Sequence, residues 1–170
     1  MLVNAFLFDM SDPDNPTIIL VQKVDQSDRW ALPGGKSLDD ECPLDACCRE
    51  IADEVGPNAA DAVPEYWDEL EIDRGKYKQY VFVTPFSGKL RKKGLKEKDD
   101  NGNLTESLGP PTWVHLSDVS RGIVTVGKEF SEIYPSHMNA IAEALIALAD
   151  YYPELKHYAE ATKPYAWDKG

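Results

Sequence analysis

The segment from residue 43 to residue 55, PLDACCREIADEV, constrains the fold most, because its apolar residues recur at the spacing of a helix. At about 100° per residue, its apolar side chains form one stripe roughly 60° wide. They are Leu44, Cys48, Ile51 and Val55. The sequence therefore predicts a helix over residues 43–55 whose stripe faces a hydrophobic core.

The acidic residues of this segment gather on an adjoining face of the predicted helix. Glu50, Asp53 and Glu54 lie three and four residues apart, so their carboxylates span roughly 100° of the helix. The small residues Ala46 and Cys47 precede them on that face, which predicts a shallow acidic shelf with room above it. Like charges at this spacing repel by about a few tenths of a kcal/mol per pair, and a hard divalent cation such as Mg²⁺ would relieve that repulsion. A solvated acidic face is the alternative.

A glycine turn, Pro33-Gly34-Gly35, precedes the helix and allows backbone carbonyls to approach a ligand closely. From Gly35 to residue 57 the chain follows the pattern G-x5-E-x7-R-E-U-x-E-E-x-G-U, where U is aliphatic, at every specified position except two. This pattern resembles the Nudix box, the signature motif of the Nudix hydrolases. The exceptions are Asp53, which replaces the first glutamate of the E-E pair, and Pro57, which replaces the last aliphatic residue and is expected to stop the helix.

The resemblance implies a fold and an activity. The implied fold is of the α/β (α+β) class: a Nudix-type α/β/α sandwich with a mixed β-sheet between helices. Family members use metal-activated water to hydrolyse a diphosphate linked to another moiety, which implies a nucleoside triphosphate, dinucleotide or nucleotide sugar as substrate. The implied cofactor is Mg²⁺ or Mn²⁺. A catalytically weak or inactive Nudix-fold nucleotide sensor is the alternative, which the departure at Asp53 keeps open.

The resemblance also implies roles for residues of the motif. The implied metal ligands are the carbonyl of Gly34 and the carboxylates of Glu50, Asp53 and Glu54. Arg49 is expected to orient these carboxylates, and Glu41 to support them from behind. Arg49, Glu50 and Glu54 are thus predicted to be catalytic, and the shorter side chain of Asp53 is expected to weaken one metal site.

The general base varies within the family, so two kinds of candidate stay open. One is Glu50, and the other is an acid on the long segment 87–109. We favour Glu106, because family members often carry an acid several positions before a Trp-Val strand, which here begins near Trp113. An exposed loop carboxylate with no role is the alternative for Glu106.

Candidate substrate contacts lie on both sides of the glycine turn. Lys23 and Lys36 are predicted to contact phosphate, with simple exposure on the surface as the alternative for each. Trp30 is predicted to stack on a base, with packing in the core as the alternative. A basic run over residues 89–98 would either clamp substrate phosphates or form a solvated stretch of charge.

The rest of the chain predicts two hairpins, a further strand and a second long helix within a single domain, residues 1–170. The hairpins pair residues 2–8 with 17–24, and 66–72 with 77–85; the further strand covers residues 112–116. The helix is expected over residues 132–151, with Ser131 as its N-cap. Residues 87–109 have few apolar anchors, so we expect a long loop that is either functional or disordered.

Charge narrows the class of partner. Lys and Arg number 18 against 30 Asp and Glu, a formal net charge of −12, which disfavours a broad surface for nucleic acid or anionic lipid. We expect a small nucleotide or other diphosphate substrate, held through cations, and the resemblance allows a homodimer. The N-terminus lacks a basic leader, no apolar stretch is long enough to span a bilayer, and three clustered cysteines suggest no disulfide framework. These features predict a cytoplasmic protein.

Overall fold

A computed structural model describes the backbone of residues 1–167 and the side chains of residues 1–163. Its centre is a mixed sheet in the order β3-β2-β1-β6-β5, in which β4 also pairs with β1 and β9 with β2. β1 and β6 run parallel, and the other pairs are antiparallel. The strands are β1 (Leu2–Asp9), β2 (Thr17–Gln22), β3 (Trp30–Ala31), β4 (Gly34–Lys36), β5 (Asp68–Asp73), β6 (Lys78–Pro85) and β9 (Thr112–His115). Both predicted hairpins and the further strand are confirmed.

Strand β1 is buried on both faces because its side chains alternate between two cores. Val3, Ala5 and Leu7 pack with residues of the first helices. Phe6 and Phe8 point the other way and pack with residues of the C-terminal helices. A nearly continuous apolar strand of this kind is typical of the centre of a sheet covered on both sides.

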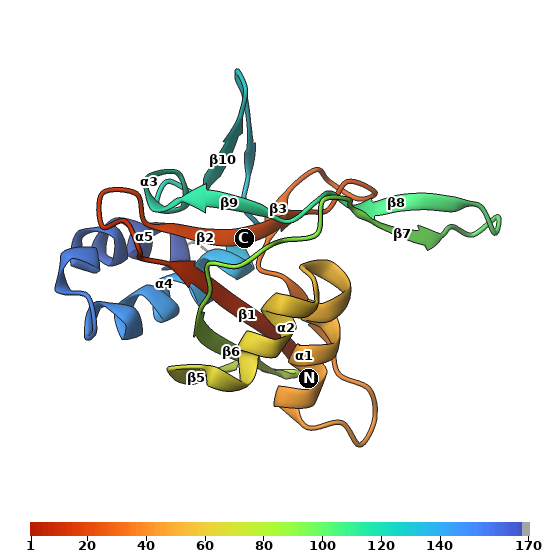
Figure 1. The fold of residues 1–170 in the computed structure, drawn as a ribbon, viewed down its shortest axis with the longest axis horizontal. Helices are drawn as coiled ribbons and strands as arrows, with labels where there is room; N and C mark the ends of the chain where they lie inside the picture. The colour runs from red at the N-terminus through yellow and green to blue at the C-terminus, as the bar shows by residue number, and fades with distance from the viewer. Residues whose placement is uncertain (168–170) are drawn as a thin grey trace.

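Helices cover the two faces of this sheet (Figure 1). α1 (Pro43–Glu54) and α2 (Pro57–Ala62) lie on one face, and α4 (Pro135–Ala149) and α5 (Lys156–Trp167) on the other. Short helices complete the chain: α3 (Leu116–Val119), η1 (Val63–Glu65) and η2 (Pro153–Leu155). The predicted α/β/α sandwich with a mixed sheet is therefore confirmed.

The predicted start of the second long helix is wrong. The helix begins at Pro135, where the missing N–H of proline costs nothing in the first turn. The residues before it form a hairpin of β10 (Ile123–Val126) and β11 (Glu129–Glu132), which projects from the body of the molecule (Figure 1). Gly127 makes the turn with a φ of 63°, and Ser131 lies in β11 rather than at an N-cap.

Segment 87–109 is not disordered. Most of it forms a second projecting hairpin, β7 (Leu95–Lys98) and β8 (Leu104–Leu108), which turns at Gly102 with a φ of 80° (Figure 1). Its strands carry many charged side chains and are largely exposed. A two-stranded ribbon buries little apolar surface, which is why the apolar pattern did not reveal it.

Helix α1 departs from the predicted division of its faces. Ile51 and Val55 are buried as expected, but Ala46 and Cys47 are also fully buried and extend the core face toward the glutamates. The shelf is therefore narrower than the helical wheel indicates. Pro57 follows the end of α1, as expected, but it also stands at the first position of α2.

No helix among the described residues is both long and apolar enough to cross a bilayer.

Candidate active site

The glycine turn lies directly against helix α1. The N–H of Gly34 donates a hydrogen bond to the Glu54 carboxylate at 3.3 Å. Gly34 has a φ of +145°, and a Cβ at this position would stand 2.0 Å from the carbonyl oxygen of Val3, so only glycine fits. A Cβ on Gly35 would stand 2.8 Å from the Glu50 carboxylate. Both glutamates therefore rest on the backbone of the turn.

Glu54 is the most buried acid of the site, with 6% of its surface exposed. Burial raises its pKa to about 8, although the charge of Lys23 and the N–H of Gly34 act in the opposite direction. The nearby Glu50 carboxylate raises the pKa further. Glu54 is thus a buried carboxylate whose ionised form lacks full compensation from the protein.

Arg49 ties the neighbouring carboxylates together. Its Nε donates to Oε2 of Glu41 at 2.9 Å and its Nη2 to Oε1 at 3.0 Å, a bidentate pair. Its Nη1 donates to Oε1 of Glu50 at 2.9 Å, and its Nη2 also reaches the carbonyl of Lys36 at 3.1 Å. The Arg49 guanidinium and the N–H of Leu38 lower the pKa of Glu41 to about 2. Arg49 thereby fixes the orientation of Glu50.

Asp53 does not join the two glutamates. Asp53 is exposed, and its backbone carbonyl accepts a hydrogen bond from the guanidinium of Arg91. Among the described residues, no group of three or more His, Cys, Asp or Glu side chains is placed to hold a metal. The acidic cluster is therefore Glu50 and Glu54 at the glycine turn, one member smaller than the predicted set.

These donors nevertheless fit a hard divalent cation. The carboxylates of Glu50 and Glu54 and the backbone carbonyl of Gly34 are oxygen ligands, which Mg²⁺ and Mn²⁺ prefer. Magnesium sites in proteins commonly use one or two carboxylates and complete the shell with water and substrate phosphate. Two carboxylates and one backbone carbonyl match that pattern.

The predicted substrate contacts, Lys23, Lys36 and Trp30, and the candidate general base Glu106 lie in different surroundings. Lys23 follows β2, and its charge acts on Glu54, so it lies at the acidic pair. Lys36 is exposed, and its own backbone carbonyl accepts a hydrogen bond from Arg49. Glu106 lies exposed on β8, opposite Lys96 in the hairpin. Trp30 is a correction: its ring is only 4% exposed and packs in the core, which leaves no face for a base.

A buried polar network behind the turn was not predicted. Nδ2 of Asn4 donates to the carbonyls of Leu32, at 3.1 Å, and Pro33, at 3.4 Å. Nε2 of Gln79 donates to Oδ1 of Asn4 at 2.8 Å, and Arg74 donates to Oε1 of Gln79 through Nη2, at 2.7 Å, and Nε, at 2.9 Å. The available signal was a lone polar residue inside an apolar strand, Asn4 in LVNAFLF and Gln79 in KQYVFV.

His137 of α4 holds the turn from the other side. Its Nδ1 accepts a hydrogen bond from the N–H of Leu32 at 3.1 Å, which requires the tautomer with its proton on Nε2. Burial, together with the charges of Lys23 and Arg74, lowers the pKa of His137 to about 4. A neutral histidine and a neutral amide pair thus hold the backbone that leads into Gly34.

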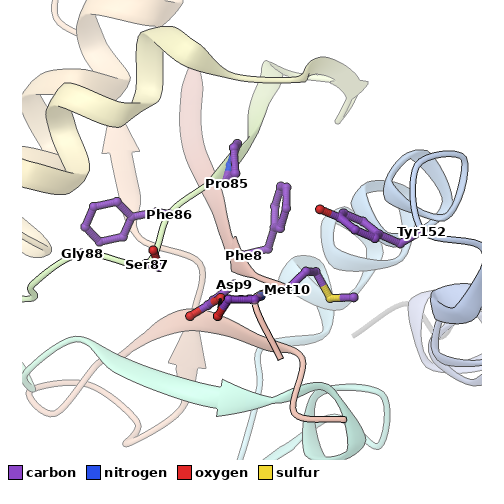
Figure 2. Close-up of a pocket in the computed structure, with 9 residues that line it drawn as sticks. Phe8, Asp9, Met10, Pro85, Phe86, Ser87, Gly88 and Tyr152 are labelled. Atoms are coloured by element: carbon purple, nitrogen blue, oxygen red, sulfur yellow. Dashed lines mark hydrogen bonds between the residues drawn. The ribbon is translucent and has the colours of Figure 1, made fainter. Parts of the chain in front are cut away.

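A separate pocket of about 470 Å³ opens at the carboxyl ends of β1 and β6 (Figure 2). Figure 2 shows the rings of Phe8, Phe86 and Tyr152 around it, with Asp9 at its edge. The glycine turn pairs with Asn4 on β1. Asn4 lies four residues before Phe8 of the pocket, which is about 13 Å along the strand. None of the predicted site residues lines this pocket.

Several known proteins are similar to this chain in sequence or in fold. An RNA pyrophosphohydrolase of Helicobacter pylori (strain ATCC 700392 / 26695) is 23% identical over 127 residues, which are 72% of this chain and 81% of that protein. The NUDIX domain of Shewanella oneidensis NrtR, complexed with ADP ribose, has a TM-score of 0.53 at 18% identity and covers 86% of each chain. A MutT/nudix family protein from Enterococcus faecalis has a TM-score of 0.52 at 18% identity, over 88% of this chain and 61% of that one.

The two solved structures share the fold, and the family follows from the sequence model. Residues 2–132 match the model of the NUDIX domain, which covers most of the 170 residues and includes the turn, α1 and the polar network. The chain therefore belongs to the NUDIX domain family.

Proposed function

We propose that the chain is a divalent-cation-dependent diphosphohydrolase that cleaves a nucleoside diphosphate linked to another moiety. The observation that carries this proposal is the pair of glutamates, Glu50 and Glu54, seated on the backbone of the glycine turn. Glu54 is buried without full compensation of its charge, and a cation of matching hardness supplies that compensation. Mg²⁺ and Mn²⁺ are the proposed cofactors.

Each residue of the site then has a task. Glu50, Glu54 and the Gly34 carbonyl would hold the cation, which when bound neutralises phosphate charge and lowers the pKa of water. Arg49 keeps Glu50 oriented through its hydrogen bond and keeps Glu41 ionised behind it. Lys23, at the edge of the acidic pair, is proposed to bind a phosphate oxygen of the substrate.

Three further assignments complete the proposal. Asp53 would act on the cation only through an intervening water, because it is exposed and outside the pair. Lys36 is free to reach a phosphate from the surface. The general base is Glu50, which is already at the site, or Glu106, which would have to approach from the hairpin.

A substrate panel tests the proposal. The protein is incubated with Mg²⁺ or Mn²⁺ and a nucleoside triphosphate, a dinucleoside polyphosphate, a nucleotide sugar, ADP-ribose or a short RNA with a 5′-triphosphate. The RNA belongs in the panel because the Helicobacter pylori relative is an RNA pyrophosphohydrolase. Release of phosphate, pyrophosphate or a nucleoside monophosphate that depends on the cation is the expected result. Turnover that is unchanged after removal of divalent cations contradicts the proposal.

A nucleotide sensor with the same fold is the second candidate. It is favoured by Asp53, which is both shorter than the glutamate of the motif and outside the acidic pair. The same panel separates the two functions when nucleotide affinity is measured beside turnover by calorimetry. Tight nucleotide binding with no turnover of any compound identifies the sensor.

A further inference from the structure

The base of the β7–β8 hairpin encloses a hollow of about 690 Å³. Cationic side chains line it together with one carboxylate: Arg91, Lys92, Lys93 and Lys96 with Glu106. We call this site the basic hollow. Its volume falls within the range of small-molecule sites, about 300 to 1,000 Å³. It belongs to the basic run for which the sequence left two roles open.

The cations of the basic hollow outnumber its one carboxylate, Glu106. Within the described part of the chain, Arg91, Lys92, Lys93 and Lys96 form no salt bridge, although the protein carries 30 acidic residues. Like charges held together repel unless an anion enters between them. In a chain with net charge −12, a concentrated positive site with four cations and one carboxylate points to an anion from outside the protein.

The basic hollow is built into the fold rather than carried on a free loop. A Cβ on Gly94 would stand 2.1 Å from the carbonyl of Leu108 and 3.0 Å from Oε1 of Glu106, so the strands close tightly beneath the hollow. Ser107 adds a hydrogen bond from its hydroxyl to the carbonyl of Leu95 at 3.2 Å. These contacts hold the start of β7, beside Lys93 and Lys96, against the end of β8.

One root of the hairpin attaches to the helix that carries the acidic pair, and the other attaches to β2 beside Lys23. The N–H of Arg91 donates to the carbonyl of Val55 at 2.7 Å, and its guanidinium binds the carbonyl of Asp53, so it caps the last turn of α1. The N–H of Gly109 donates to the carbonyl of Gln22 at 2.9 Å, one residue before Lys23. The basic hollow is therefore anchored to the end of α1, which carries Glu54, and to the end of β2.

We propose that the basic hollow binds phosphate groups of the substrate that extend beyond the diphosphate being cleaved. The enzyme would then favour substrates with three or more consecutive phosphates. This inference rests on the proposed function and names the substrate class within it. A nucleotide and the 5′-end of an RNA can both supply such a phosphate chain, and the experiments below separate these sources.

A binding experiment tests the basic hollow without any turnover. Protein freed of metal on a chelating resin is titrated with inorganic tripolyphosphate and with orthophosphate by calorimetry. Tripolyphosphate is expected to bind more tightly, and the triple variant Lys92→Gln, Lys93→Gln, Lys96→Gln to bind it about 10-fold more weakly, which is about 1.4 kcal/mol. A control variant removes the same charge elsewhere from exposed lysines: Lys76→Gln, Lys128→Gln, Lys156→Gln.

The control decides how the binding result is interpreted. Equal weakening in both triple variants would show a general charge effect and overturn the site. Equal affinity for tripolyphosphate in the wild type and in the Lys92, Lys93 and Lys96 variant also overturns it. Because no substrate is cleaved here, either result stands apart from success or failure of the proposed function.

A turnover experiment then identifies the source of the phosphate chain. The ratio of kcat/KM for ATP to that for ADP-ribose is expected to fall about 10-fold in the Lys92, Lys93 and Lys96 variant and to stay unchanged in the control variant. A 5′-triphosphorylated RNA measured beside ATP shows which carrier is preferred. If the ratio of kcat/KM to that for ADP-ribose is unchanged in the Lys92, Lys93 and Lys96 variant both for ATP and for the RNA, the substrate does not use the basic hollow.

Discussion

Glu54 is a carboxylic acid that the fold has largely removed from water. It is affected by the N–H of Gly34, the Glu50 carboxylate and the charge of Lys23. The two glycines permit this arrangement, because a side chain on either would displace the carboxylates or the backbone of β1. The site therefore depends on the absence of a Cβ atom at Gly34 and Gly35 as much as on the carboxylates of Glu50 and Glu54.

Replacement of Glu54 by glutamine tests its proposed role. Glu54→Gln keeps the shape of the side chain and removes the charge that would hold a cation, so kcat is expected to fall about 100-fold or more. The measurement uses the best substrate of the panel. Glu143→Gln, an exposed glutamate of α4, is the matched control and should keep full activity. A fully active Glu54→Gln enzyme would exclude Glu54 from the machinery.

His137 predicts a loss of stability in acid. Its pKa is about 4 in the folded protein and about 6.5 in an unfolded chain, so the unfolded state binds more protons between these values. Stability from this residue is present above pH 6.5 and is lost as the pH falls toward 4, by about 2 kcal/mol. Urea denaturation at pH 7 and at pH 4.5 measures the loss.

The variant His137→Asn isolates this contribution. An asparagine oxygen can accept the hydrogen bond of the Leu32 N–H and does not titrate. The loss of unfolding free energy between pH 7 and pH 4.5 should be about 2 kcal/mol smaller in the variant. Identical losses in the two proteins would assign the acid sensitivity to other groups.

At the scale of elements, the polar network joins β1, β6, the glycine turn and the start of α4. Arg74 also donates to the carbonyl of Ser136 at 2.7 Å, which links the β5–β6 hairpin to α4. Asn4 and Gln79 are 2% and 1% exposed, so each depends on the other for hydrogen bonds that water cannot replace. Through the hydrogen bonds of Asn4 to Leu32 and Pro33, the network holds the backbone of the glycine turn in place.

A double-mutant cycle tests this support. Gln79→Met leaves Asn4 and Arg74 without their shared partner and should lower the free energy of unfolding by about 2 kcal/mol. Asn4→Leu should also destabilise, but the double variant should lose less than the sum of the two single losses. Additive losses in urea denaturation would show that the two amides act independently.

The sequence predicted some elements better than others, for a physical reason. α1 and the central hairpins are predictable from their apolar residues, because α1 buries one face and the strands β1 and β2 are buried on both. The hairpins β7–β8 and β10–β11 bury little, so their charged strands resembled loops. The second long helix was placed three residues early because Ser131 offered a cap, whereas Pro135 sets the actual start.

At the scale of the whole molecule, charge is divided unevenly. The acidic pair lies on α1 against the glycine turn, and the basic hollow is attached to the same helix. The net charge of −12 still disfavours a broad nucleic-acid surface. A cytoplasmic location and a homodimer stay predictions, the latter measurable by sedimentation.

Cation binding should stabilise the whole fold. A ligand that binds only the folded state at 100 times its Kd adds about 2.7 kcal/mol, so Mn²⁺ should raise Tm clearly. Potassium chloride at matched ionic strength serves as the control for screening. Glu54→Gln should abolish most of the Mn²⁺ effect. An equal shift in the variant would place the cation elsewhere on the protein.

The sequence by itself determined the family, the sandwich and the residues of the glycine turn and its helix, because a motif at constant spacing encodes local geometry. Tertiary structure alone decided that Asp53 stays outside the acidic pair, that Trp30 packs in the core, and that Arg91 caps α1. It also decided that Asn4 and Gln79, 75 positions apart, meet behind the turn. Contacts between distant segments depend on how strands pair and helices pack, and local patterns of residues do not predict those pairings.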